Sequence, residues 1–165
     1  MPPHRRCSRI RLATPIVLGG ILFLLHLSAV GCGPRPTLVE EFWPDGRPRL
    51  RKEVARLADG SVIDNGLYIR WFDNGNKEYE ATYRHGKLHG VERAWHRNGR
   101  LWTENQYQDG RRHGTFLAWD EEGRRRKQEQ YRNDQPHGEW VVWDPEGRVK
   151  WRAAFENGVP VSQSH

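Results

Sequence analysis

Four sets of residues recur along this chain of 165 residues with a single step of 24 positions. A glycine opens each unit, a tryptophan follows five places later, a second glycine four places after that, and an aromatic residue eight places further on. A fixed period of this length predicts a stack of one repeated supersecondary unit, each copy contacting its neighbours. The repeat positions are Gly66, Trp71, Gly75 and Tyr83, then Gly90, Trp95, Gly99 and Tyr107, then Gly114, Trp119, Gly123 and Tyr131, then Gly138, Trp143, Gly147 and Phe155.

Each unit contains two strand-like runs joined by a turn, which predicts a β-hairpin. In the first unit these runs are 67–71 and 77–83. Gly75 suits a type I turn closed by a residue at positive φ, because glycine takes that backbone without strain. Pro145 and Pro44 stand at the first central position of the same turn, where φ near −65° is needed. The sequence therefore predicts an all-β fold, an elongated antiparallel sheet of stacked hairpins.

Alternation along the strands predicts which face of the sheet is buried. Leu67, Ile69 and Trp71 share one face, and the corresponding residues of the later units share it too. We expect this face to be the buried one, with rings of the Tyr83 type filling the spaces between successive tryptophans. About nine or ten strands are expected, giving a body on the order of 45 Å long. Pro160 cannot donate to a ladder and is expected to end the pairing.

The N-terminal segment, residues 1–31, has the features of a lipoprotein-type signal peptide that forms one short helix. Four arginines without an acid precede an apolar run of 15 residues, 16–30, which is short for a membrane span. Ala29-Val30-Gly31-Cys32 resembles a lipobox, so Cys32 is the predicted lipidation site. Ordinary secretion and an uncleaved anchor are the alternatives.

The predicted mature chain is one repeat domain behind a tether. Residues 32–40 form the tether and 41–165 the repeat domain, with a degenerate unit at 41–65 and full units at 66–89, 90–113, 114–137 and 138–161. Of the 27 Lys and Arg, four lie in the signal segment, which leaves 23 against 21 Asp and Glu. A surface so close to neutral does not favour a nucleic-acid partner.

No constellation typical of catalysis stands out, so we expect a protein that is not an enzyme and uses no cofactor. His89, His113 and His137 recur with the repeat, and two strands per unit would separate them by about 10 Å, too far for one metal ion. They are expected to form hydrogen bonds beside the glycines. Carboxylates such as Glu121 fall in turns or on solvated strand faces. No serine or cysteine lies in the core of the repeat.

The whole pattern, seen from Gly66 to Gly90, resembles the variant of the MORN (membrane occupation and recognition nexus) repeat. Four units match it, and Asp134 departs from it where the others have glycine. The resemblance implies an elongated β-sheet scaffold, membrane proximity and self-association. Bacterial proteins with this variant are often labelled as antitoxins of toxin–antitoxin pairs.

These observations predict an exported, membrane-anchored lipoprotein of the cell envelope, with a secreted or periplasmic protein as the alternative. Its repeat domain would be a scaffold that binds a protein, or a second copy of itself through the sheet edges. An antitoxin-like protein that neutralises a toxin is the second hypothesis, and an envelope hydrolase is the third. Partner binding is expected where the units differ, at Tyr68, Phe116, Trp140, Arg124, Arg125 and Arg126.

Overall fold

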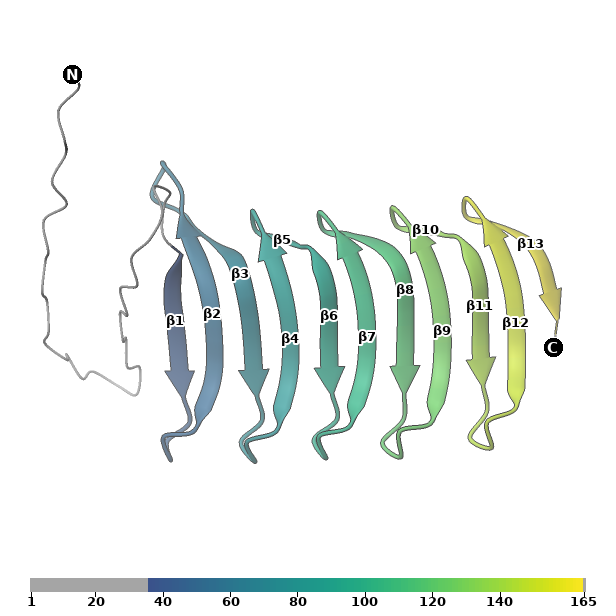
Figure 1. Ribbon diagram of the computed structural model, residues 1–165, viewed down its shortest axis with the longest axis horizontal. Helices are drawn as coiled ribbons and strands as arrows, with labels where there is room; N and C mark the ends of the chain where they lie inside the picture. The colour runs from purple at the N-terminus through teal and green to yellow at the C-terminus, as the bar shows by residue number, and fades with distance from the viewer. Residues whose placement is uncertain (1–35, 165) are drawn as a thin grey trace, which may run out of the picture.

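A computed structural model describes residues 36–164 as one open antiparallel sheet of thirteen strands with no helix among those residues (Figure 1). Neighbouring strands follow chain order, and β5 and β10 are two-residue pieces beside the main path. The predicted signal helix, Cys32 and the first part of the tether lie outside the described residues. The strands are β1 (Thr37–Phe42), β2 (Pro48–Arg56), β3 (Val62–Trp71), β4 (Lys77–Arg84), β5 (Lys87–Leu88), β6 (Gly90–Trp95), β7 (Leu101–Gln108), β8 (Arg111–Trp119), β9 (Arg125–Arg132), β10 (Gln135–Pro136), β11 (Gly138–Trp143), β12 (Val149–Glu156) and β13 (Val159–Ser164).

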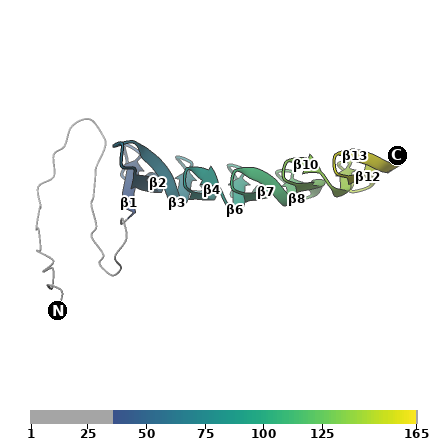
Figure 2. The ribbon, with the colours of Figure 1, turned by 90° about the horizontal axis from the view of Figure 1, so that it is seen from above.

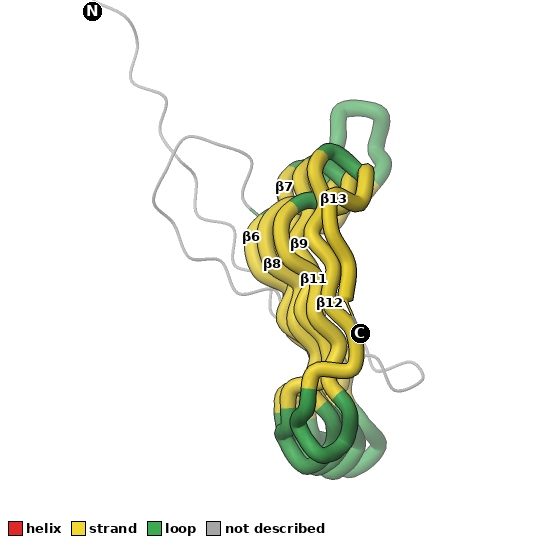
Figure 3. Tube along the Cα trace, turned by 90° about the vertical axis from the view of Figure 1, so that its right-hand side faces the viewer, coloured by secondary structure: helices red, strands yellow, loops and turns green. Residues whose placement is uncertain are grey.

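The sheet is a single layer over the described residues. Seen from above, its strands form one thin band (Figure 2). Seen along the stack, they superpose as one curved profile (Figure 3). The prediction of an all-β sheet of stacked hairpins is therefore confirmed, while the strand number exceeds the expected nine or ten. The excess arises because the thirteen include the two-residue pieces β5 and β10 and the terminal strand β13, which follows the last full hairpin.

The turns at one end of the sheet follow the predicted geometry. In the turn after β3, the amide of Gly75 donates to the carbonyl of Phe72, and the amide of Phe72 donates to the carbonyl of Asn76. Gly75 has a φ of 88°, and the same bonds recur around Gly46, Gly99, Gly123 and Gly147. The three-residue hairpin loop expected from the sequence is confirmed at all five positions.

The turns at the opposite end are tighter, with two consecutive residues at positive φ. His85 and Gly86 take φ values of 52° and 75°, as the first and second central residues of a type I′ turn do. Asp134, the residue that departs from the glycine column, also has a positive φ of 69°. The turn is therefore retained in the unit that lacks the glycine, because aspartate tolerates this backbone better than most residues do.

The buried side chains lie mainly on the face opposite to the one predicted. Register places Tyr68 opposite Ala81 and Gly66 opposite Tyr83, so the face that carries Tyr83, here the Tyr face, also carries Ala81. Ala81 is 1% exposed. Most of the buried residues lie on this face, namely Leu50, Val54, Ala81, Glu129, Tyr131 and Ala153.

The opposite face, here the Trp face, is less covered. Leu67 and Val91 on it are 38% and 36% exposed, and Val141 alone among its described residues is buried. The tryptophans are half-buried because each ends its strand, as Trp71 ends β3 and Trp95 ends β6, and has no strand residue beyond it. The expectation of a buried Trp face was wrong, and so was the expected alternation of Trp and Tyr, because Tyr83 lies on the other face.

Three features of the terminal units differ from the sequence prediction. β1 begins at Thr37, within the predicted tether, because Leu38 and Val39 pair with β2. The longer degenerate unit contains an additional turn of the Gly75 type, with Gly60 at a φ of 87°. Pro160 lies inside β13 and pairs with Phe155, since an edge strand can hold a proline whose nitrogen needs no partner.

Candidate interaction surface on the Tyr face

A row of aromatic rings crosses the Tyr face from strand to strand. In the C-terminal half, ring centroids lie 5.3 Å apart for Tyr107 and Phe116, 5.0 Å for Phe116 and Tyr131, and 5.2 Å for Tyr131 and Trp140. Trp140 and Phe155 continue the row at 4.8 Å. Tilted and edge-on ring pairs at such separations stabilise a fold by about 0.5–1.5 kcal/mol each beyond simple burial.

The rings of this row come alternately from the first and the second strand of successive hairpins. Tyr131, Tyr107 and Phe155 come from the second strand of a hairpin, and the predicted partner-binding residues Phe116 and Trp140 come from the first. Tyr68 takes the same place in the first unit, 5.8 Å from both Tyr79 and Tyr83. All three predicted residues thus lie in one row, and all three are half-buried.

Glu92 interrupts the row in the second unit. It occupies in β6 the place that Tyr68, Phe116 and Trp140 occupy in the other units. Asn105, directly opposite, donates from Nδ2 to Glu92 Oε2 at 2.7 Å. The row is therefore divided by one carboxylate into a short N-terminal part and a longer C-terminal part.

An open pocket of about 710 Å³ lies at this interruption. Its apolar walls come from Phe72, Tyr79 and Trp102, with the small side chains of Ala94 and Thr103 leaving space between them, and Glu92 contributes the carboxylate. His96 lies beside Trp102, with 5.8 Å between ring centroids. Trp102 is 51% exposed. Sequence reasoning missed this site, although Trp102 is a tryptophan outside the repeating columns, at a position where the other full units have charged residues.

Two arginines of the pocket are already paired with acids. Arg70 Nη2 lies 3.3 Å from Glu78 Oε1, and Arg97 forms an ion pair with Asp73. Both guanidinium groups also lie over rings, Arg70 at 5.6 Å from the Tyr79 centroid and Arg97 at 5.8 Å from that of Phe72. Their charges are thus balanced locally.

Burial and the charge of Glu92 together perturb the neighbouring phenols. The pKa of Tyr79 is raised well above its ordinary value, first by burial and then by the carboxylate of Glu92. The pKa of Tyr107 is raised by the same two causes. Glu92 is therefore close enough to act electrostatically on the rings on either side of it.

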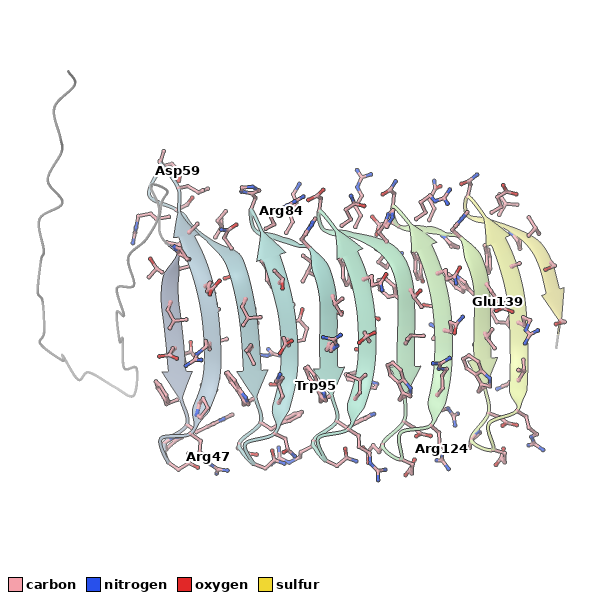
Figure 4. The ribbon with its side chains drawn as sticks, viewed as in Figure 1. Arg47, Asp59, Arg84, Trp95, Arg124 and Glu139 are labelled. Carbon is pink, nitrogen blue, oxygen red and sulfur yellow. The ribbon has the colours of Figure 1, made fainter. Side chains whose placement is uncertain are left out.

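The basic run predicted as a partner-binding site is paired within the chain. Arg124 contacts Asp120 at 2.9 Å and Glu122 at 2.7 Å, and Arg126 lies 3.8 Å from Asp120. The guanidinium of Arg125 lies 5.8 Å from the ring centroid of Trp143. The three arginines are not brought together with Tyr68, Phe116 and Trp140 into one site, because they lie at the turn-side end of the hairpin. Arg124 is labelled there in Figure 4.

The recurring histidines lie beside the tight turns. His89 Nδ1 accepts from the amide of Asp109 at 3.4 Å, and His113 Nδ1 lies 3.3 Å from Asn133 Oδ1. His137 Nδ1 is buried with no hydrogen-bond partner among the described residues. Residues 36–164 contain no group of three or more His, Cys, Asp or Glu that could hold a metal ion.

Comparison with known sequences identifies the repeat. The MORN repeat variant matches residues 64–85 and 88–109, which confirms the resemblance for the first two full units. No curated protein matches the chain. The part of the chain that the structure describes has no helix long and apolar enough to cross a membrane.

Proposed function

We propose that this protein is a non-enzymatic scaffold, held at a membrane of the cell envelope by a lipid on Cys32, whose repeat sheet binds a protein partner on the Tyr face. The observation that carries the proposal is the single layer: half-buried rings line the Tyr face, and no second layer of residues 36–164 covers them. Extended repeat surfaces of this kind commonly bind other proteins.

Exposed aromatic groups support the choice of the Tyr face over the Trp face. Trp102, at 51% exposure, belongs to the pocket of the Tyr face, and tryptophan and tyrosine are the residue types most enriched among the binding hot spots of interfaces. Besides its half-buried tryptophans, the Trp face presents isolated aliphatic side chains such as Leu67, interspersed with ion pairs such as that of Lys77 with Glu80.

The docking part of the proposal is tested with two variants, each of which removes a side chain that is exposed to solvent. Trp102→Ala removes an exposed ring of the Tyr face, and Leu67→Ala removes an exposed side chain of the Trp face. Each tagged full chain is isolated from membranes of the cell that produces it, and the bound proteins are quantified. We expect Trp102→Ala to lose most of its partner and Leu67→Ala to keep it. Equal retention by both variants would reject the Tyr face as the docking surface.

The tethering part is tested separately at Cys32. A Cys32→Ala chain should lose lipid labelling and move from the membrane fraction to the soluble fraction, because acyl chains contribute about 0.8 kcal/mol of membrane affinity per buried methylene. A Cys32→Ala chain that is still processed and still sediments with membranes would contradict the lipid anchor. A partner identified as a toxin neutralised by the scaffold would instead support the antitoxin hypothesis.

A further inference from the structure

We propose that the pocket at Glu92 receives a basic side chain, an arginine or a lysine, of the protein partner. This inference rests on the proposed function and assigns the chemistry of its central contact. It follows from three features of the pocket: a carboxylate with no intramolecular cation, aromatic walls, and rim arginines that already have acidic partners.

The carboxylate of Glu92 differs from that of Glu129, the buried acid of the Tyr face. Glu129 lies 2.6 Å from Lys127 Nζ and accepts from the hydroxyl of Tyr131 at 3.1 Å. Glu92 accepts from the neutral amide of Asn105, and within residues 36–164 no Lys, Arg or His nitrogen lies within ion-pair distance of it. A partner that docks here would take this carboxylate out of water, and a basic side chain of the partner would supply the cation that it lacks within residues 36–164.

The walls of the pocket suit a cation that carries apolar methylenes. Tyr79, Trp102 and Phe72 surround the space, and ring faces attract ammonium and guanidinium groups. Guanidinium groups of this chain already lie over rings at this site, as Arg70 does over Tyr79. The methylenes of an incoming side chain would pack against Ala94 and Thr103. A pocket of about 710 Å³ has room for such a side chain.

The charges at the rim do not satisfy Glu92. Arg70 is paired with Glu78 and Arg97 with Asp73, and the imidazole of His96 contacts the carbonyl of Trp119 through Nε2 at 3.0 Å. Of the carboxylates and guanidinium groups that line the pocket, Glu92 is the one without an oppositely charged partner among the described residues, so the pocket favours a cation over an anion.

The test uses the lipidated full chain in detergent micelles, labelled with 5-fluorotryptophan. The Trp102 resonance is assigned with a Trp102→Phe chain. Three blocked tripeptides serve as probes: Gly-Arg-Gly, its neutral isostere Gly-citrulline-Gly, and Gly-Glu-Gly. We expect the arginine peptide to shift the Trp102 resonance saturably, with at least tenfold higher affinity than the other two. Equal binding of the citrulline peptide, or stronger binding of the glutamate peptide, would overturn the proposal.

Two substitutions that each remove one negative charge distinguish binding at Glu92 from a general electrostatic effect. Glu92→Gln should weaken binding of the arginine peptide at least fivefold. Glu139→Gln removes an acid that lies outside the pocket and pairs with Arg152 at 3.2 Å (Figure 4), and it should leave the affinity unchanged. An unchanged affinity in Glu92→Gln, or an equal loss in both variants, would also overturn the proposal.

A double variant guards against the argument that Glu92 substitutions merely unfold the pocket. Glu92→Phe with Asn105→Ala reproduces the pairing of an aromatic residue with alanine seen for Trp140 and Ala153. It should complete the aromatic row and keep or raise the melting temperature while the arginine peptide no longer binds.

Two outcomes distinguish this proposal from the proposed docking face. If Trp102→Ala loses the natural partner and Glu92→Gln keeps it, the basic contact is contradicted and the docking face is supported. If the arginine peptide binds and neither variant affects the partner, the docking face fails.

Discussion

The same strands build the two faces of this sheet, and the faces differ in what their largest side chains do. On the Tyr face, rings from successive strands touch one another, as Phe116 touches both Tyr107 and Tyr131. On the Trp face, tryptophans are separated by the column that contains Lys77 and Arg125, which lie over Trp95 and Trp143. Trp95 lies near the turns, at the end of its strand (Figure 4). Burial in a single-layer sheet is thus decided by position along the strand and by cross-strand neighbours more than by side-chain size.

The largest expected effect is on the free energy of unfolding, when the removal of a ring from the Tyr face is compared with the removal of one from the Trp face. Tyr131 is 6% exposed, and Tyr131→Ala should lower the free energy of unfolding by about 3–5 kcal/mol, as the loss of a buried aromatic residue does. Trp119→Ala on the Trp face should lower it by about 2 kcal/mol, because Trp119 is only half-buried. Urea unfolding followed by circular dichroism measures both. A larger loss for Trp119→Ala would restore the Trp face as the principal core.

The Tyr face should also make stability depend on alkaline pH. Burial and the adjacent carboxylate of Glu129 raise the pKa of Tyr131 from near 10 to about 12. The folded state therefore holds this proton more tightly than the unfolded state, so the stabilisation is complete below pH 10 and is lost as pH rises towards about 12. Urea midpoints measured across this range should fall, and they should fall less steeply in Tyr131→Phe. Equal slopes for the two proteins would contradict the assignment.

The turns next to the tryptophans should contribute a smaller amount to the free energy of unfolding. Asn74 Nδ2 donates to the carbonyl of Arg97 in the next unit at 2.8 Å, so it joins consecutive hairpins. Asn74→Ala removes this bond and the one that Asn74 Oδ1 accepts from the amide of Asn76, so it should lower the free energy of unfolding by about 1–2 kcal/mol. Asn74→Asp serves as the control that keeps the side-chain acceptor for Asn76 and removes the donor. If thermal unfolding shows no loss in either variant, the turns do not couple the units.

The smallest expected effect concerns the cations that separate the tryptophans. Lys77 Nζ lies 5.0 Å from the ring centroid of Trp95 and 2.6 Å from Glu80. Lys77→Gln should lower stability by only about 0.5 kcal/mol, because both contacts are partly exposed to solvent. Chemical denaturation in low and high salt measures the change. A loss above 2 kcal/mol would mean that the Trp face is held together by its cations.

The repeat made the hairpins and their turns predictable, because Gly75 and Pro145 stand where the backbone geometry leaves little choice. The buried face was not predictable from alternation alone. Leu67 and Trp71 are apolar, but the bulge between Arg70 and Trp71 and the end of the strand leave Trp71 with few neighbours. The row of Tyr68, Phe116 and Trp140 was identified from differences among units. The pocket at Trp102 depends on a single side chain that no other unit repeats, because the bulge beside it recurs in every full unit.

The central claim, that the Tyr face docks the partner, is tested most directly by photocrosslinking from two adjacent positions of β8. Benzoylphenylalanine replaces Phe116 on the Tyr face in one full-length chain and Leu117 on the Trp face in another. After irradiation in the producing cell, the chain with the probe at 116 should form one covalent adduct with the partner, and the chain with the probe at 117 should form none. An adduct from 117 alone, or equal adducts from both positions, would contradict the claim.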